Sequence, residues 1–235
     1  MSVKENLEIV REHMSKAIDR AGRKTGDVKL MAVSKFHPID EILEAVEGDQ
    51  LLFGENRVQE ATEKFPQILN QHKNIELHMI GQLQTNKVKN AVKIASCIQS
   101  VDRFDLIKEI EKQCAKIDKS IKILFEIHTG EDSKSGFTSE EELRRSLDAL
   151  NNKEFPHVIP TGFMTMAPFT KDETLIHKSF KTLRELSEKL KSDYPDFEMN
   201  ELSMGMSGDY EIAIEEGSTL IRVGTAIFGE RNYNK

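Results

Sequence analysis

The sequence predicts an α/β fold, a (β/α)8 barrel preceded by one extra helix. Two observations carry this prediction. Eight short apolar runs of strand length recur along the chain, and seven amphipathic segments with helical spacing separate them. The 235 residues are slightly fewer than the roughly 250 that are usual for this architecture, the TIM barrel. There is no linker or low-complexity segment, so residues 1–235 are predicted to form a single domain.

The strands and helices follow one another in strict alternation. A first helix is indicated by apolar residues at helical spacing and by Gly22, which offers a left-handed cap. The apolar runs predict strands at 28–33, 51–53, 75–80, 97–101, 121–127, 158–164, 201–203 and 219–223. Helices are expected at 40–48, from about 57 to 65, and at 103–117, 140–150, 173–190 and 210–216. A further helix is expected to begin with Thr85 or Asn86 as its N-cap. Pro66 is expected to end the helix that begins near residue 57.

A doubly wound open sheet is the alternative fold. It normally carries one glycine-rich turn after the first strand, and no G-x-G-x-x-G pattern follows residues 28–33. The pattern therefore favours the barrel.

Composition excludes several functional classes. The formal net charge of -7 and the pI near 5.6 argue against an electrostatic nucleic-acid binder. Cys97 and Cys114 are too few for a disulfide framework, which favours a reducing compartment. The N-terminus does not resemble a signal peptide, and no apolar run of about 18 residues is present. We therefore expect a soluble, cytoplasmic protein that does not act at a membrane.

Lys35 is the most informative single residue. The apolar run 28–33 delivers it to a strand-to-helix junction, because Pro38 cannot continue the strand and suits the first turn of a helix. In α/β barrels this junction is where ligands bind. A desolvated lysine amine with a depressed pKa forms a Schiff base with an aldehyde. On its local sequence alone, however, a lysine at a strand end is more often a solvated charge.

The loops after the last two predicted strands have the composition of a phosphate site. They read S-M-G-M-S-G-D and R-V-G-T-A, and such loops commonly bind phosphate in barrels. Glycine lets the backbone approach an anion, and hydroxyl groups add donors, so we place a phosphate near Ser207, Gly224 and Thr225. Barrel closure puts the first strand beside the eighth, which brings Lys35 to the same part of the rim. A lysine beside a phosphate cradle predicts pyridoxal 5'-phosphate (PLP) as cofactor.

Six segments along the chain are distinctive: A-V-S-K-F-H-P, F-G-E-N-R-V-Q-E, L-H-M-I-G-Q-L-Q-T-N-K, E-D-S-K-S-G-F, S-M-G-M-S-G-D and I-R-V-G-T-A-I-F-G. Together they resemble a known family, the pyridoxal phosphate homeostasis proteins, which are relatives of the alanine racemase N-terminal barrel domain. They occur in the family's order and span essentially the whole chain. The resemblance implies a barrel that carries PLP on Lys35, has no demonstrated enzyme activity, and buffers and distributes this vitamin B6 form inside cells.

The resemblance also assigns roles to residues. It implies the Schiff base on Lys35, phosphate binding by Ser207, Gly224 and Thr225, and a contact between Arg222 and the pyridine nitrogen. Further motif positions near the cofactor fall on Asn56, His78 and Met204. For His78, flanked by apolar residues, a satisfied core histidine is the commoner outcome.

The sequence departs from the family pattern at two places. Phe36–His37 stands where a small or basic pair is more frequent, and Glu126–Ile127–His128 stands where Q-V-N is usual. The first departure touches the neighbour of Lys35. Because of the second departure, the resemblance assigns no role to the residues at the end of that strand.

Three functional hypotheses remain from the sequence. The first is a non-catalytic PLP carrier, expected as a monomer, with apo PLP-dependent enzymes as recipients. The second is a PLP-dependent amino acid racemase-like enzyme, and the third is a barrel enzyme that acts on a sugar phosphate. A protonated arginine at the pyridine nitrogen weakens the ring as an electron sink, which favours the carrier.

The tyrosines bear on the racemase hypothesis. The resemblance places a racemase's second base, a tyrosine, in a further C-terminal domain, which we expect this chain to lack. Tyr194 and Tyr233 are expected away from the rim, and Tyr210 just past the phosphate loop.

A basic stripe, Lys87, Lys89 and Lys93, is expected to be a solvated helix face. The alternative reading is a second phosphate site or a docking surface for a recipient enzyme.

Overall fold

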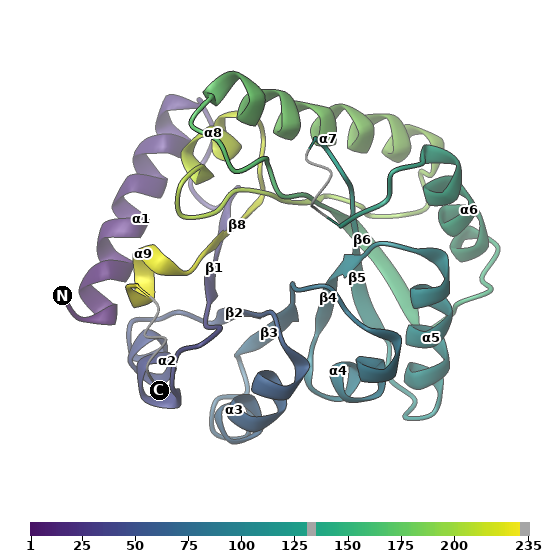
Figure 1. The fold of residues 1–235 in the computed structure, drawn as a ribbon, viewed down its shortest axis with the longest axis horizontal. Helices are drawn as coiled ribbons and strands as arrows, with labels where there is room; N and C mark the ends of the chain where they lie inside the picture. The colour runs from purple at the N-terminus through teal and green to yellow at the C-terminus, as the bar shows by residue number, and fades with distance from the viewer. Residues whose placement is uncertain (131–134, 231–235) are drawn as a thin grey trace.

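The structure is a computed structural model that describes residues 1–130 and 135–230. Its centre is a closed barrel of parallel strands arranged in chain order, from β1 to β8 (Figure 1). The strands are β1 Lys29–Val33, β2 Leu52–Glu55, β3 Glu76–Met79, β4 Cys97–Val101, β5 Ile121–Glu126, β6 Val158–Met164, β7 Glu201–Ser203 and β8 Leu220–Val223. The predicted (β/α)8 TIM barrel is therefore confirmed, each of its strands within the predicted stretch or within two residues of it.

Helices surround the barrel on its outside (Figure 1). One of them, α1, precedes the first strand in the chain, as predicted. Ser2 begins α1 with a capping box, because its hydroxyl accepts from the Glu5 amide and the Glu5 carboxylate accepts from the Ser2 amide. The helices are α1 Val3–Arg20, α2 Ile39–Glu47, α3 Val58–Gln71, the 3-10 turn η1 Thr85–Lys87, α4 Val88–Ile94, α5 Phe104–Ala115, α6 Glu140–Asn151, α7 Glu173–Asp193, α8 Tyr210–Glu215 and α9 Thr225–Phe228. Within the described ranges, no helix is both long and apolar enough to cross a bilayer.

The core has two parts because successive side chains of a strand point to opposite faces. On β5, the ring of Phe125 packs against Phe137 and Phe163 in the layer between barrel and helices. The preceding Leu124 lies in a separate cluster with Cys97 and Met164. The inside of the barrel is thus filled with side chains and is not a pore.

The barrel closes by pairing its first and last strands. β1 and β8 run parallel with Lys29 opposite Leu220 and Ala32 opposite Val223. This register brings the segment after Val33 next to the segment after Val223. Strand pairing therefore makes the junction that holds Lys35 a neighbour of the predicted phosphate loop at Gly224.

One helix boundary was predicted wrongly. Pro66 does not interrupt α3, which continues to Gln71. Proline removes a helical hydrogen bond and costs about 3 kcal/mol in a helix interior. Phe65 and Ile68 on either side of it are both fully buried in the core. Burial of these two side chains offsets that cost, at about 1.5–3 kcal/mol each.

The predicted N-caps of the fourth helix are also wrong. Neither Thr85 nor Asn86 caps α4, because both lie in the 3-10 turn that precedes it, and Lys87 is the N-cap without a side-chain bond. The Thr85 hydroxyl instead accepts a hydrogen bond from Arg103 at 3.4 Å. At the other end of the chain, α9 was not predicted at all.

Candidate functional site

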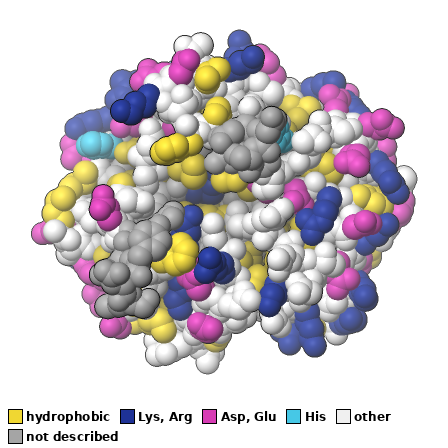
Figure 2. Space-filling model, in the orientation of Figure 1, with side chains coloured by type: hydrophobic (Ala, Val, Ile, Leu, Met, Phe, Trp, Pro, Cys, Tyr) yellow, Lys and Arg dark blue, Asp and Glu magenta, His cyan; other side chains and the backbone are white. Residues whose placement is uncertain are grey.

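A cavity of about 360 Å³ lies at the carboxyl ends of the strands. Figure 2 shows this face of the molecule, with hydrophobic and basic side chains near its centre. Six of the predicted site residues line the cavity together: Lys35, Asn56, Ser207, Arg222, Gly224 and Thr225. Met164, Met166 and Ile176 add apolar wall. The combination of apolar walls with a few converging polar groups is typical of a small-molecule site.

Two predicted residues do not line this cavity. His78 is 4% exposed, and its Nδ1 lies 2.8 Å from the side-chain nitrogen of Gln99. Met204 is fully buried in the main hydrophobic core. Both therefore lie behind the cavity wall, and a direct ligand contact for either stays a prediction.

Lys35 sits in a tight turn that begins where β1 ends. The amide of His37 donates to the carbonyl of Ser34 across this turn at 3.1 Å, and Phe36 has a φ of 66°. A side chain in this left-handed region is strained, at a cost of order 1 kcal/mol. The turn persists only because surrounding contacts hold it.

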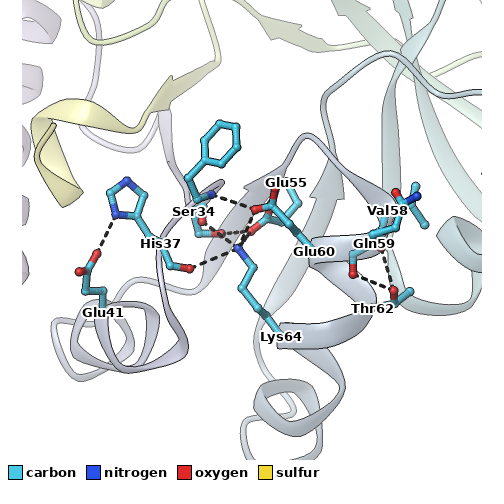
Figure 3. Close-up of polar contacts among 10 residues, drawn as sticks. Ser34, His37, Glu41, Glu55, Val58, Gln59, Glu60, Thr62 and Lys64 are labelled. Atoms are coloured by element: carbon cyan, nitrogen blue, oxygen red, sulfur yellow. Dashed lines mark hydrogen bonds and ion pairs between the residues drawn. The ribbon is translucent and has the colours of Figure 1, made fainter. Parts of the chain in front are cut away.

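The main restraint on this turn is the ammonium group of Lys64 on α3 (Figure 3). Its Nζ lies 2.5 Å from the carboxylate of Glu55 and 3.0 Å from the carbonyl of Ser34. It also reaches the carbonyl of His37 at 3.4 Å. Glu60 completes the clamp, because its carboxylate accepts from the Phe36 amide at 2.9 Å. Both backbone ends of the Lys35 turn are thereby tied to α3.

The clamp contains a buried ion pair. Glu55 is fully buried, and the Lys64 side chain is only 12% exposed. Burial raises the pKa of the Glu55 carboxyl, and the nearby Lys64 ammonium opposes that shift. Ser34 adds a hydroxyl donor to the same Glu55 oxygen at 2.8 Å. A buried carboxylate in this setting depends on its cation.

The two unusual residues after Lys35 have defined contacts. The His37 ring stacks on Phe228 of α9, with centroids 4.9 Å apart, and its Nδ1 pairs with Glu41 at 2.7 Å. Phe36 is 43% exposed, and the guanidinium of Arg57 lies 5.2 Å from its ring centroid. His37 thus joins the lysine turn to the helix that follows β8.

Arg222 lies at the base of the cavity, and only 4% of its surface is exposed. Its Nη1 donates to the carbonyl and to the hydroxyl of Ser203, at 2.6 and 2.7 Å, and its Nη2 donates to the carbonyl of Thr165 at 2.8 Å. Burial lowers the pKa of Arg222 to about 10, with the charges of Asp209 and Glu126 opposing the shift. The guanidinium is therefore still protonated at neutral pH.

The two loops predicted to hold phosphate, after β7 and after β8, both line the cavity. Gly224 precedes α9 and packs on β1, where an added Cβ would lie 3.2 Å from the carbonyl of Val33. The Ser207 hydroxyl accepts from the Ala226 amide at 3.4 Å. Asp209 holds its own loop, because its carboxylate accepts from the Met206 amide at 2.6 Å. The loop hydroxyl and the start of α9 are thereby held against each other.

Asn56 presents an unpaired polar atom. Its Oδ1 is buried and has no hydrogen-bond partner among the described residues. Its position depends on Gly81, where an added Cβ would lie 2.4 Å from the Asn56 carbonyl. Because buried polar atoms are nearly always paired, an orphaned acceptor at a cavity wall fits a polar ligand.

Glu126 differs from the family pattern and lies close to this site. It is 1% exposed, its Oε1 accepts from the Ser135 hydroxyl at 2.7 Å, and its Oε2 has no described partner. Burial raises the pKa of its carboxyl. The remaining residues 131–134 of the E-D-S-K-S-G-F segment lie outside the described residues.

The tyrosines that the structure describes do not line the cavity. Tyr194 follows α7 and donates to the carboxylate of Asp148 at 2.7 Å. Tyr210 begins α8 and is buried in the core. Tyr233 lies outside the described residues.

Sequence reasoning missed Lys64 and its ion pair with Glu55. A signal was present, because Glu60 and Lys64 are four residues apart and share one face of a helix that follows a strand ending in glutamate. It did not show that this face points toward the Lys35 turn.

The buried pair predicts a specific pattern of stability. Lys64→Met leaves the Glu55 carboxylate buried without its cation, so we expect the free energy of unfolding to fall by about 3 kcal/mol. In the Glu55→Gln/Lys64→Met double variant no buried charge remains, and most of this loss should be recovered. Urea unfolding of wild type, Glu55→Gln, Lys64→Met and the double variant measures the difference. A double variant as unstable as the sum of its single substitutions would contradict the pairing.

Glu126 predicts a pH dependence with a defined sign. Because its pKa is raised in the folded chain, its stabilising contribution is complete below the unfolded pKa and is lost as pH rises through the folded pKa. Glu126→Gln should therefore gain free energy of unfolding relative to wild type as pH rises from about 4 to about 7. Urea unfolding across this range tests it.

Glu109 on α5 is the matched control, because a hydrogen bond from Gln113 lowers the pKa of its partly exposed carboxyl. Glu109→Gln should lose stability relative to wild type over the same pH rise, and by a small amount. The same trend for both substitutions would show that burial of Glu126 is not the cause.

Comparisons with known proteins place the chain in a family. Residues 3–232 match the family model of the alanine racemase N-terminal domain. The pyridoxal phosphate homeostasis protein of Pasteurella multocida is 36% identical over 236 residues, which is 100% of each chain. That of Aquifex aeolicus is 38% identical, over 99% of this chain and 100% of its own.

A solved structure shares both fold and length. PipY of Synechococcus elongatus PCC7942, solved with PLP bound, superposes with a TM-score of 0.85 at 32% identity. The match covers 97% of this chain and 100% of PipY. The chain therefore belongs to the alanine racemase N-terminal domain family and, within it, to the pyridoxal phosphate homeostasis proteins.

Proposed function

We propose that this protein binds PLP in the cavity, as a Schiff base on Lys35, and serves in PLP homeostasis by holding the cofactor and releasing it to PLP-dependent enzymes. The observation that carries the proposal is the shared cavity, which Lys35, Arg222, Ser207 and Thr225 line together. The PLP bound to PipY supports the same ligand. We further propose that the protein acts as a monomer inside the cytoplasm.

The residues present fit this ligand in their chemistry. PLP supplies an aldehyde for a lysine and a pyridine ring that withdraws electrons from attached groups. The Lys35 amine would form a C=N bond to the aldehyde carbon with loss of one water, and hydrolysis would reverse the step. Ser207, Gly224 and Thr225 would hold the phosphate, and the orphaned Oδ1 of Asn56 would offer an acceptor to a polar group of the ligand.

Arg222 supports a carrier over a catalyst. Its guanidinium remains protonated at neutral pH, so it would donate to the pyridine nitrogen and leave that nitrogen without a proton. A ring in this state withdraws electrons less strongly. Tyr194 and Tyr210, the tyrosines that the structure describes, do not line the cavity. We therefore rank amino acid racemisation second.

His78 and Met204 would support the site indirectly. Both lie behind the cavity wall, so their contribution would pass through neighbouring side chains. Recipient enzymes would meet the rim of the barrel. Lys89 and Lys93 lie one turn apart on exposed positions of α4 and offer one basic surface there.

The covalent link predicts a visible absorption band. Purified protein given PLP should show a Schiff-base band that borohydride abolishes, and Lys35→Ala should lack the band because Lys35 is the one lysine among the described residues that line the cavity. Lys16→Ala, on an exposed position of α1, is the matched control and should keep the full band. A wild-type chain that stays colourless with PLP would contradict the proposal.

Two further assays on the same preparation separate carrier from enzyme. A carrier restores activity to an apo PLP enzyme and does not exchange the α-proton of an amino acid in deuterated water. Exchange that is lost in Lys35→Ala would instead establish the racemase-like alternative.

A further inference from the structure

Four buried polar side chains form one hydrogen-bonded chain across the inside of the barrel. They are Arg222 on β8, Ser203 on β7, Gln99 on β4 and His78 on β3. Arg222 Nη1 lies 2.7 Å from Ser203 Oγ, which lies 2.6 Å from Gln99 Oε1, and Gln99 Nε2 lies 2.8 Å from His78 Nδ1. None of the four is more than 4% exposed. The chain thus links the base of the cavity to the opposite wall of the barrel.

The direction of every bond in the chain follows from Arg222. A guanidinium can only donate, so the Ser203 hydroxyl accepts from it. The hydroxyl hydrogen is then directed at Gln99 Oε1, which turns the amino group of Gln99 toward His78. That amino group must donate, so His78 Nδ1 must accept. The imidazole proton therefore belongs on Nε2.

The surroundings of His78 agree with this assignment. Its Nε2 has no hydrogen-bond partner among the described residues and lies 3.7 Å from the Glu76 carboxylate. An N–H directed at a carboxylate is favourable, whereas a bare nitrogen there would be repelled. The reversed Gln99 amide would make Ser203 Oγ accept twice and would leave its hydroxyl hydrogen without an acceptor among its described contacts, which is costly in a buried site.

We propose that Gln99 and His78 are positioning residues, which hold the Arg222 guanidinium at the base of the cavity through Ser203, with His78 fixed as its Nε2–H tautomer. The cofactor part of this inference rests on the proposed function, because Arg222 would be the group that meets the cofactor. It also accounts for His78, a motif residue that does not line the cavity. Its role would be its hydrogen bond with Gln99, in the chain that ends at Arg222, and not ligand contact.

The first test needs no cofactor. Ring ¹⁵N chemical shifts of His78, assigned by comparison with His78→Gln, report which nitrogen carries the proton. We expect a protonated Nε2 and a bare Nδ1 in the wild-type chain. In Gln99→Glu the carboxylate can only accept, so the proton should move to Nδ1. A wild-type His78 protonated on Nδ1, or a tautomer unchanged in Gln99→Glu, would overturn the chain of bonds.

The second test measures how fast bound PLP is released. Gln99→Leu removes the acceptor of the Ser203 hydroxyl and loosens Arg222, so we expect release to be about tenfold faster. Gln99→Glu keeps that acceptor and should stay within about twofold of wild type. Cys97→Ala, from the apolar cluster inside the same barrel, is the matched control for lost packing. Equal release rates for Gln99→Leu and Cys97→Ala would refute a positioning role.

The two readouts keep this inference separate from the proposed function. If wild-type protein takes up no PLP, the proposed function fails and with it the cofactor part of the inference. The ring nitrogen shifts then still decide whether the chain from Arg222 to His78 exists.

Discussion

The parallel pairing of β1 with β8 is the constraint on which the candidate site depends. It places Ala32 opposite Val223, so the chain leaving β1 and the chain leaving β8 enter the same cavity. Lys35 comes from the first and Gly224 from the second, although 188 residues lie between them in the sequence. Stacking of His37 on Phe228 reinforces this contact beyond the last paired residues. Backbone pairing thus brings Lys35 and the loop predicted to bind phosphate to one cavity.

Two buried cations then fix the site from opposite directions. Lys64 approaches from outside the barrel and ties the Lys35 turn to Glu55, while Arg222 lies inside the barrel and is held by Ser203 and Thr165. A buried charge is expensive unless it is paired or fully hydrogen-bonded, so each cation has few alternative positions. Because each buried cation must keep its partners, Lys64 and Arg222 hold the backbone segments around the cavity in one position. A carrier benefits from such rigidity, because a preformed site binds with less loss of freedom.

The sequence predicted the architecture well because each strand is marked by its own run of apolar residues. It also predicted that Lys35, Ser207 and Gly224 would share one rim, since barrel closure follows from strand order. Packing decided the features that it missed. Pro66 is tolerated inside α3 because Phe65 and Ile68 anchor the helix. The role of Lys64 and the distance of His78 from the cavity depend on which way a helix face or a strand face points, and local sequence does not specify this.

The central claim is that one amine, that of Lys35, forms the covalent link to PLP. Peptide mapping after borohydride reduction of the PLP-loaded wild-type protein tests it directly, because reduction fixes the cofactor on whichever lysine holds it. We expect the cofactor mass on the peptide that contains Lys35, at one cofactor per chain, with Lys64 unlabelled inside its clamp. Cofactor distributed over exposed lysines, or found on Lys64, would contradict the account.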